Sequence, residues 1–424
     1  MIVLGLWSTL KQVSNPSFVY SLSDILTGYS PANSPHLTPA LELDSAIIEF
    51  SGTLPSRGLP TIVSSEADVA VLMNALEEVI RNLNFWQYYV LDVAREQESV
   101  KAALISSNIT PWSGSDVAEK TVVELADAIR ASGCIVGYRQ LASRYGVRVD
   151  PAVAAGLVRA AFVHLSSADE LSEAWGRIID VVNVPLYQEW ENDTKVAIDN
   201  VRNRLRYTRL ELKQGEISKT YASASPTFRF SQISRSPLVE PYFTRLAPTP
   251  KSDPLVYSLA NNGWIWAADP LQNFAQLPSK AYLRREVIVW GDCVKLRYGA
   301  GPDDNPWLWS HMASYVTSLA SMFDGFRIDN CHSTPLSVGV YMLDAARVVN
   351  PDLYVSAELF TGSEEMDLLF VKRLGINSLI RESGNGWDPV EYSRLLYRHG
   401  VGKPIGKILV FHSIVLSWLV RLDG

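Results

Sequence analysis

Asp329 and Glu358 each end a run of residues that is typical of a buried strand, at 325–329 and at 353–360. Alternate residues of a strand share a face, so Arg327 lies on the same face as Asp329. A guanidinium beside a carboxylate favours the ionised form of that carboxylate. An ionised carboxylate held at the end of a strand can act as a nucleophile. The pattern therefore predicts a nucleophile at Asp329 and a second functional carboxylate 29 residues later.

Two carboxylates on adjacent strand ends suit the cleavage of glycosidic bonds with retention of configuration. One carboxylate attacks the anomeric carbon, and the other protonates the leaving oxygen and then activates an incoming water or sugar hydroxyl. The two groups must lie about 5–5.5 Å apart, and neighbouring strands are about 4.8 Å apart. We expect the negative charge of Asp329 to raise the pKa of Glu358 and so keep this acid protonated.

Each of these residues also has a structural interpretation. An Arg and an Asp two positions apart on a strand often form an ion pair with no catalytic role. A histidine such as His332 is more often a structural hydrogen-bonding group than a catalyst. Five tryptophans between positions 264 and 309 can stack on sugar rings or pack in a core. Trp264 is the best candidate for sugar contact, because Asn-Gly precedes it in an expected loop.

The elements that would position the two carboxylates alternate between helix and strand patterns. This alternation predicts parallel strands joined by crossover helices, but periodicity alone does not distinguish a closed barrel from an open sheet. Carboxylates at the C-terminal ends of consecutive strands favour a barrel, and the chain lacks the glycine-rich phosphate loops of many doubly wound sheets. The expected helices are 306–319, 336–349, 364–374 and 388–398, and the expected strands are 323–329, 353–360 and 376–381.

The first three hundred residues show a different, mainly helical pattern. Apolar residues recur at three- and four-residue spacing from Val69 to Leu83, which indicates an amphipathic helix. Residues 1–65 are rich in Ser, Pro and Gly with only scattered apolar runs, and the two prolines at 33–39 predict a loop. Residues 214–255 are rich in Ser, Thr and Pro and are expected to form loops and short strands. Further helices are expected at 115–132, 151–164, 167–182 and 188–213.

The composition is that of a globular protein and limits its partners. The chain has 424 residues, 47% of them hydrophobic and 20% charged, with a formal net charge of −7. No block of basic residues occurs, which argues against nucleic acid and membranes as partners. Three widely spaced cysteines and no signal peptide indicate a reducing, cytoplasmic location. No metal-ligand spacing occurs, so no metal or other cofactor is predicted.

Several longer motifs resemble one family. Residues 325–329 are similar to the nucleophile strand of the α-amylase clan of glycoside hydrolases and transglycosylases, and the longer matches resemble the glycogen debranching enzymes of animals and fungi. The similarity runs over about residues 30 to 406 and is strongest at 261–382. The matching segments are 33–37, 262–264, 269–271, 282–286, 290–298, 329–335, 341–347, 357–364 and 373–376.

The resemblance implies the 4-α-glucanotransferase half of that family, which moves maltooligosaccharides between chain ends of glycogen or limit dextrin by a retaining double displacement. The amylo-1,6-glucosidase activity of the family belongs to a separate C-terminal domain. The implied roles are nucleophile for Asp329, general acid/base for Glu358, orientation of the nucleophile for Arg327, and a hydrogen bond to sugar for His332. The clan's usual histidine lies one position further from the nucleophile than His332 does.

The chain also departs from the clan. It contains no Asn-His pair, as expected near a third barrel strand, and no His-Asp pair, which would supply a third carboxylate. We therefore expect an α/β fold with a partial (β/α)8 TIM-type barrel, about strands four to six, at 301–406. It would follow a large, mostly helical inserted domain at 31–300, with atypical segments at 1–30 and 407–424.

Such a fragment would expose both edges of its three strands, so we expect it to fold poorly and to have little activity alone. Two other functions remain open. A non-catalytic α-glucan-binding fragment would bind maltooligosaccharides without turnover. An α-amylase-like hydrolase would use the same two carboxylates with water as the acceptor.

Overall fold

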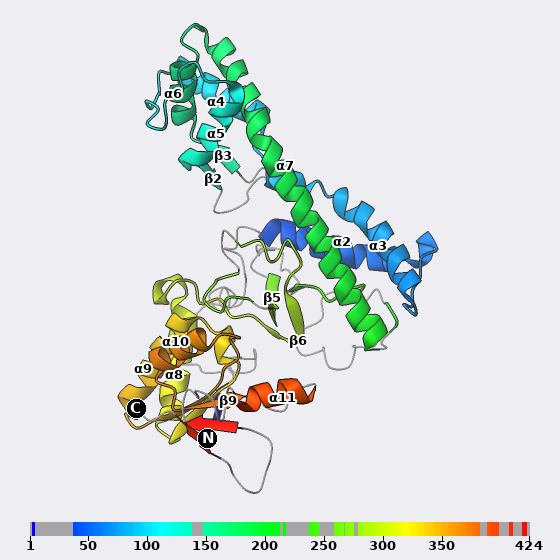
Figure 1. Ribbon diagram of the computed structural model, residues 1–424, viewed down its shortest axis with the longest axis vertical. Helices are drawn as coiled ribbons and strands as arrows, with labels where there is room; N and C mark the ends of the chain where they lie inside the picture. Colours follow the sequence, from blue (N-terminus) through cyan, green and yellow to red (C-terminus); the bar gives the residue numbers. More distant parts are fainter. Residues whose placement is uncertain are drawn as a thin grey trace. The chain divides into compact units, whose positions relative to one another are not determined.

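The computed structural model describes residues 2–4, 37–137, 147–212, 215–217, 237–245, 258–266, 268–274, 279–381, 388–397, 407–409 and 418–421. The chain divides into two compact units (Figure 1). The helical unit comprises residues 33–243 and 274–287, and the sheet unit comprises 1–32, 244–273 and 288–424. The domain boundaries expected from the sequence stay a prediction.

The helical unit is built along one long helix, α7 (Ala168–Arg206). Its first half shares a core with α4 (Val93–Ile105), α5 (Val122–Ser132) and α6 (Pro151–Ala161). Its second half shares another core with α2 (Leu37–Thr53) and α3 (Glu66–Arg81). Figure 1 shows these two groups along the green helix. This unit also contains a short antiparallel pair, β2 (Ile135–Gly137) and β3 (Val147–Val149).

The 39 residues of α7 correct the expectation of two helices, at 167–182 and 188–213. Pro185 lies inside the helix and, lacking an N–H, cannot bond the carbonyl four residues earlier. The structure satisfies that carbonyl otherwise: Arg130 Nη1 donates to the Val181 oxygen over 3.2 Å. The helix begins with a capping box formed by Ser167 and Glu170. A partner distant in sequence therefore lets the helix continue through the proline.

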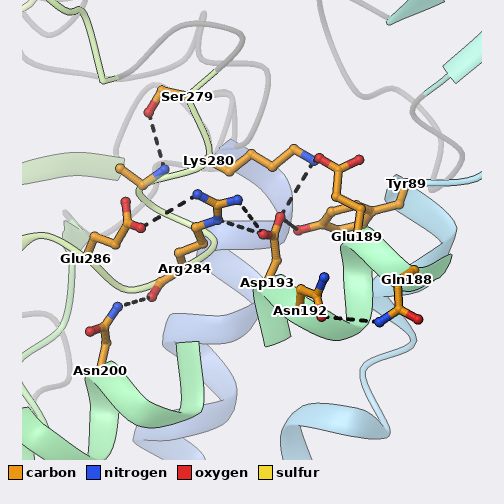
Figure 2. Close-up of polar contacts among 11 residues, drawn as sticks. Tyr89, Gln188, Glu189, Asn192, Asp193, Asn200, Ser279, Lys280, Arg284 and Glu286 are labelled. Carbon is orange, nitrogen blue, oxygen red and sulfur yellow. Dashed lines mark hydrogen bonds and ion pairs between the residues drawn. The ribbon is translucent and has the colours of Figure 1, made fainter. Parts of the chain in front are cut away.

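Residues 279–287 are anchored within the helical unit by a polar cluster around Asp193 (Figure 2). The Asp193 side chain is only 4% exposed. It accepts hydrogen bonds from the Tyr89 hydroxyl at 2.9 Å and from Arg284 Nε at 2.7 Å. Lys280 Nζ lies 3.6 Å from Asp193 and 4.3 Å from the centroid of the Tyr89 ring. These contacts give the motif at 282–286 a structural role.

The sheet unit contains a six-stranded sheet in the order β1-β7-β8-β9-β11-β10. The strands β1 (Ile2–Leu4), β7 (Gly325–Ile328), β8 (Tyr354–Glu358) and β9 (Ser378–Arg381) run parallel. Strand β11 (Trp418–Arg421) is antiparallel to β9, and β10 (Lys407–Leu409) is antiparallel to β11. The expectation that the three central strands would expose both edges is wrong, because β1 pairs with β7 and β11 pairs with β9.

Three helices pack on one face of this sheet. They are α8 (Pro306–Ala320), α9 (Leu336–Val349) and α10 (Glu364–Leu374), and they share one core with Phe326, Val355 and Leu379 of the strands. The bounds of α9 and α10 match the sequence prediction, and α11 (Pro389–Leu396) lies within the predicted 388–398. The alternation of helices and parallel strands is therefore confirmed over the described residues.

A second, three-stranded sheet contains β4 (Phe243–Arg245), β5 (Ser258–Trp264) and β6 (Ile288–Val294). β5 and β6 are antiparallel, with an irregular register between Asn261 and Gly263. Leu259 of β5 belongs to the core under the six-stranded sheet, and Val294 packs against that core. Most of the loop region expected at 214–255 lies outside the described residues.

Candidate active site

The two carboxylates lie at the ends of neighbouring parallel strands in matching register. Gly325 pairs with Tyr354 and Ile328 with Ala357, so each residue of β7 faces the residue 29 positions later on β8. Continued by one residue, this register sets Asp329 beside Glu358. Gly325 allows the strands to approach, because a Cβ at this position would lie 2.9 Å from the Tyr354 carbonyl oxygen. The 29-residue spacing between Asp329 and Glu358 therefore equals the offset of the strand register, and the two residues lie side by side.

The alternation of side chains along β7 separates the core from the polar face. Phe326 and Ile328 are buried in the core with the helices. Arg327 points to the other face with a side chain that is 22% exposed, and Asp329 follows at 29%. The Glu358 side chain is 18% exposed. The carboxylates are thus partly shielded from water but still open to a ligand.

Arg327 contacts both carboxylates. Its Nη1 lies 2.7 Å from Asp329 Oδ1, and its Nη2 lies 3.5 Å from Glu358 Oε2. The contact to Asp329 is therefore the closer one. A guanidinium with five fixed donors is suited to this shared arrangement. The sequence predicted the pair with Asp329 but did not indicate the contact with Glu358.

Glu358 has the electrostatics expected of a general acid. Burial is the largest effect and raises the pKa of this carboxyl. The hydrogen bond and negative charge of Asp329 raise it further, against the lowering effects of the Asn330 N–H and of Arg327. A raised pKa keeps more of the acid protonated near neutral pH, which proton donation to a leaving oxygen requires.

Asn330 is a residue of the site that sequence reasoning missed. Its backbone N–H donates to Glu358 Oε2 over 3.0 Å. Its φ of 47° lies in the left-handed region, which asparagine tolerates better than most residues. This turn starts the 3-10 segment Cys331–Ser333 and directs the N–H toward Glu358. The only feature of the sequence that could have indicated this turn is an asparagine directly after the expected strand.

His332 lies against the end of β8. Its Nδ1 accepts a hydrogen bond from the Phe360 N–H at 3.3 Å, and the two rings have centroids 5.6 Å apart. In the neutral form an accepting Nδ1 assigns the proton to Nε2. The backbone bond supports the structural interpretation of this histidine, while its predicted contact with sugar stays a prediction.

The tryptophans, and two further aspartates of the matching motifs, lie on other elements. Trp264 ends β5 in the second sheet and packs against Trp266. Trp307 and Trp309 are buried in the core, as their structural interpretation expects. Asp269 caps a turn by accepting the Leu271 N–H at 2.9 Å. The side chains of Trp290 and Asp292 lie outside the described residues.

Neither metal coordination nor membrane insertion is indicated by the part of the chain that is described. Within it, no group of three or more His, Cys, Asp or Glu residues is arranged to hold a metal ion. Its helices include none that combines the length and apolar character needed to cross a membrane.

Comparison with known proteins agrees with the resemblance of the motifs. The family model described as "Glycogen debranching enzyme, glucanotransferase domain" matches residues 23–354. The chain belongs to this family. It is also 42% identical over 388 residues to a protein of Saccharomyces cerevisiae named "Glycogen debranching enzyme". That match covers 89% of this chain and 24% of the yeast protein, so the chain spans about a quarter of the length of this relative.

The family match includes one carboxylate of the pair and stops short of the other. Asp329 lies inside the matched range, whereas Glu358 lies four residues beyond its end at 354. The segment that carries Asp329 therefore lies within the part of the chain that matches the family model. The place of Glu358 beside it rests on the strand register and on the contacts of Arg327 and Asn330.

Proposed function

We propose that this chain carries the central part of a 4-α-glucanotransferase active site acting on α-1,4-linked glucan, as in glycogen, limit dextrin or maltooligosaccharides. The observation that supports this proposal most is the pair of Asp329 and Glu358, set side by side by the β7–β8 register and joined through Arg327. Membership of the glucanotransferase-domain family supports the same substrate class.

In the proposed first step, a carboxylate oxygen of Asp329 forms a bond to the anomeric carbon as the glycosidic bond breaks. Glu358 gives its proton to the leaving oxygen. In the second step, Glu358 takes the proton of an acceptor hydroxyl, whose oxygen attacks the anomeric carbon and releases Asp329 as a carboxylate. Arg327 holds the nucleophile in place, and its positive charge offsets part of the negative charge of the pair.

We further propose that β7, β8 and β9 are three consecutive strands, about the fourth to sixth, of an α-amylase-type (β/α)8 barrel. Their parallel order, the helices between them and the carboxylates at their C-terminal ends support this assignment. The helical unit would then correspond to a domain inserted before these strands. Because the chain has no His-Asp pair for a third carboxylate, we expect its turnover to be low.

Trapping of the covalent intermediate tests the two roles independently of turnover. α-Maltotriosyl fluoride needs no acid catalysis, because fluoride leaves without a proton. In a Glu358→Gln variant the sugar should accumulate as an ester on Asp329, since no base activates the acceptor. Intact-mass spectrometry and peptide mapping would detect and locate this ester.

Matched controls come from carboxylates of the same unit. Both controls are made in the Glu358→Gln background. There, Asp329→Asn should give no ester, whereas Asp324→Asn, at an exposed position just before the same strand, should accumulate the ester as Glu358→Gln alone does. An ester on another residue, or one that persists in Asp329→Asn, would contradict the assignment of the nucleophile.

The products formed from maltoheptaose separate the two alternatives. A glucanotransferase makes both longer and shorter oligomers, whereas an α-amylase-like hydrolase makes only shorter ones. A non-catalytic glucan-binding fragment would gain thermal stability from maltoheptaose and form neither product nor trapped ester.

A further inference from the structure

Trp264 and Trp266 form an aromatic pair at the end of β5. Their ring centroids are 5.8 Å apart, and the ring planes are tilted by 54°. Trp266 is 77% exposed, whereas Trp264 is half-buried. No other tryptophan whose side chain is described is as exposed, and Trp175, Trp307 and Trp309 are buried. Trp266 therefore does not serve the core as these tryptophans do.

The backbone around the pair is fixed by hydrogen bonds. Trp264 pairs with Ile288 of β6. A turn follows, closed by the Ala268 N–H donating to the Ile265 carbonyl oxygen over 3.3 Å. Trp266 lies between these two bonded residues, two positions after Trp264, so both rings come from one short segment. Side chains that are already positioned lose less conformational freedom when they bind a ligand.

The chemistry of the pair selects a neutral ligand with apolar faces. Indole rings offer large, rigid contact area, and the faces of a glucose ring carry C–H groups that pack against it. The acid that follows the pair most closely in sequence, Asp269, accepts the Leu271 N–H with its Oδ1 in the adjoining turn. The segment thus presents two aromatic faces rather than an ion-binding group, which fits sugar better than a charged ligand.

The tilt between the rings selects among glucans. Successive glucose units of an α-1,4 chain turn relative to one another, so that the chain curves. Successive units of a β-1,4 chain lie in a flat ribbon, which coplanar rings fit best. Two rings tilted by 54° at a spacing of 5.8 Å suit two neighbouring units of a curved chain.

We propose that Trp264 and Trp266 form a binding platform for two consecutive glucose units of an α-1,4-glucan chain. This proposal rests on the substrate class of the proposed function and adds Trp266 and the geometry of stacking to it. The platform belongs to the same unit as Asp329 and Glu358. Its role is to hold glucan, so its contribution is to affinity and not to the bond-breaking step.

Calorimetric titration of the full chain with maltoheptaose tests the platform. An Asp329→Asn background prevents turnover, so that binding is measured at equilibrium. Trp266→Ala should weaken binding about fivefold, as expected for the loss of one aromatic contact worth about 1 kcal/mol. Trp266→Phe keeps a ring and should recover most of the affinity. Cellopentaose, a β-1,4-glucan, should bind more weakly than maltoheptaose.

A matched control uses the aromatic pair of half-buried Trp86 and exposed Tyr187 in the helical unit, whose centroids are 5.7 Å apart. Tyr187→Ala should leave maltoheptaose binding unchanged. Circular dichroism would verify that each variant is folded. Equal affinity of Trp266→Ala and its parent, equal weakening by Tyr187→Ala, or equal binding of cellopentaose would overturn the platform.

The two proposals fail in different ways. If the ester on Asp329 forms but Trp266→Ala binds like its parent, the catalytic proposal stands and the platform is wrong. If Trp266→Ala weakens binding but no ester forms on Asp329, the platform stands as a glucan-binding surface and the catalytic proposal is wrong.

Discussion

Replacing Asp44 should destabilise the helical unit more than any exposed ion pair does. Asp44 of α2 and Arg285 form a salt bridge of 3.1 Å whose side chains are 2% and 3% exposed. The Asp44 carboxylate also accepts the backbone N–H groups of Tyr242 at 2.8 Å and Phe243 at 3.3 Å. The Arg285 guanidinium lies 3.6 Å from the centroid of the Tyr242 ring. One buried carboxylate thus connects three parts of the chain.

The expected magnitude follows from what each substitution leaves behind. Asp44→Ala leaves a buried guanidinium without its anion, and breaking a buried pair in this way costs about 3–5 kcal/mol. Two buried N–H groups also lose their acceptor. Arg285→Met leaves a buried carboxylate that still accepts both N–H groups, so we expect it to cost somewhat less. The double variant should cost less than the sum of the single ones, because no unpaired charge remains.

Urea unfolding followed by far-ultraviolet circular dichroism measures these differences through the midpoint and slope. Arg206→Met is a matched control, because the Arg206–Glu66 pair is 2.7 Å long but its side chains are 46% and 62% exposed. This control should change the free energy of unfolding by less than about 1 kcal/mol. An Asp44→Ala chain within about 1 kcal/mol of the parent, or a control as costly as Asp44→Ala, would contradict the dominant role of this buried pair.

Three further predictions follow from the titratable and polar groups. Asp329→Asn removes the charge and hydrogen bond that raise the pKa of Glu358, so a ¹³C NMR titration should show this pKa falling; an unchanged or higher pKa would contradict the coupling. Burial raises the pKa of Glu96 to about 7. The stabilising contribution of the neutral acid is complete below the ordinary carboxyl pKa and is lost as pH rises through about 7. The free energy of unfolding should therefore fall by up to ~3 kcal/mol between pH 5 and pH 8, and Glu96→Gln should flatten this dependence in urea titrations. Ser356 and Ser378 have buried hydroxyls with no hydrogen-bond partner among the described residues. Ser378→Ala should therefore be neutral or raise the melting temperature, and a loss above about 2 kcal/mol would show that the hydroxyl is bonded after all.

The local patterns around the site could be predicted from the sequence because they depend on near neighbours. Helix α8 begins at Pro306, as expected, with Asn305 as its N-cap, and the bounds of α9 and α10 agree with those expected from the sequence. The proximity of Asp329 and Glu358 followed from two similar strands of a βαβ unit, in which consecutive parallel strands are neighbours.

The remaining features depend on residues that are distant in sequence. Proline disfavours a helix interior, and the bond from Arg130 to the Val181 carbonyl, 51 residues away, satisfies the acceptor that Pro185 leaves open in α7. The pairing of β1 with β7 joins residues more than 300 positions apart, and no local pattern indicates it. The roles of Arg284 and Arg285 likewise depend on Asp193 and Asp44, which the motif at 282–286 does not contain.

The two faces of the central sheet differ in a way that stability alone does not explain. The face toward the helices is apolar, with Phe326, Val355 and Leu379 in the core. On the opposite face, the register sets Arg327 beside Ser356 and Ser356 beside Ser378. Arg327 and Ser356 in this polar row each lie two residues before a carboxylate, Asp329 and Glu358 respectively. Buried hydroxyls without partners cost roughly 1–3 kcal/mol each, and apolar residues in these positions would avoid that cost. A sheet selected only to fold would be apolar here, so stability alone does not account for this polar row.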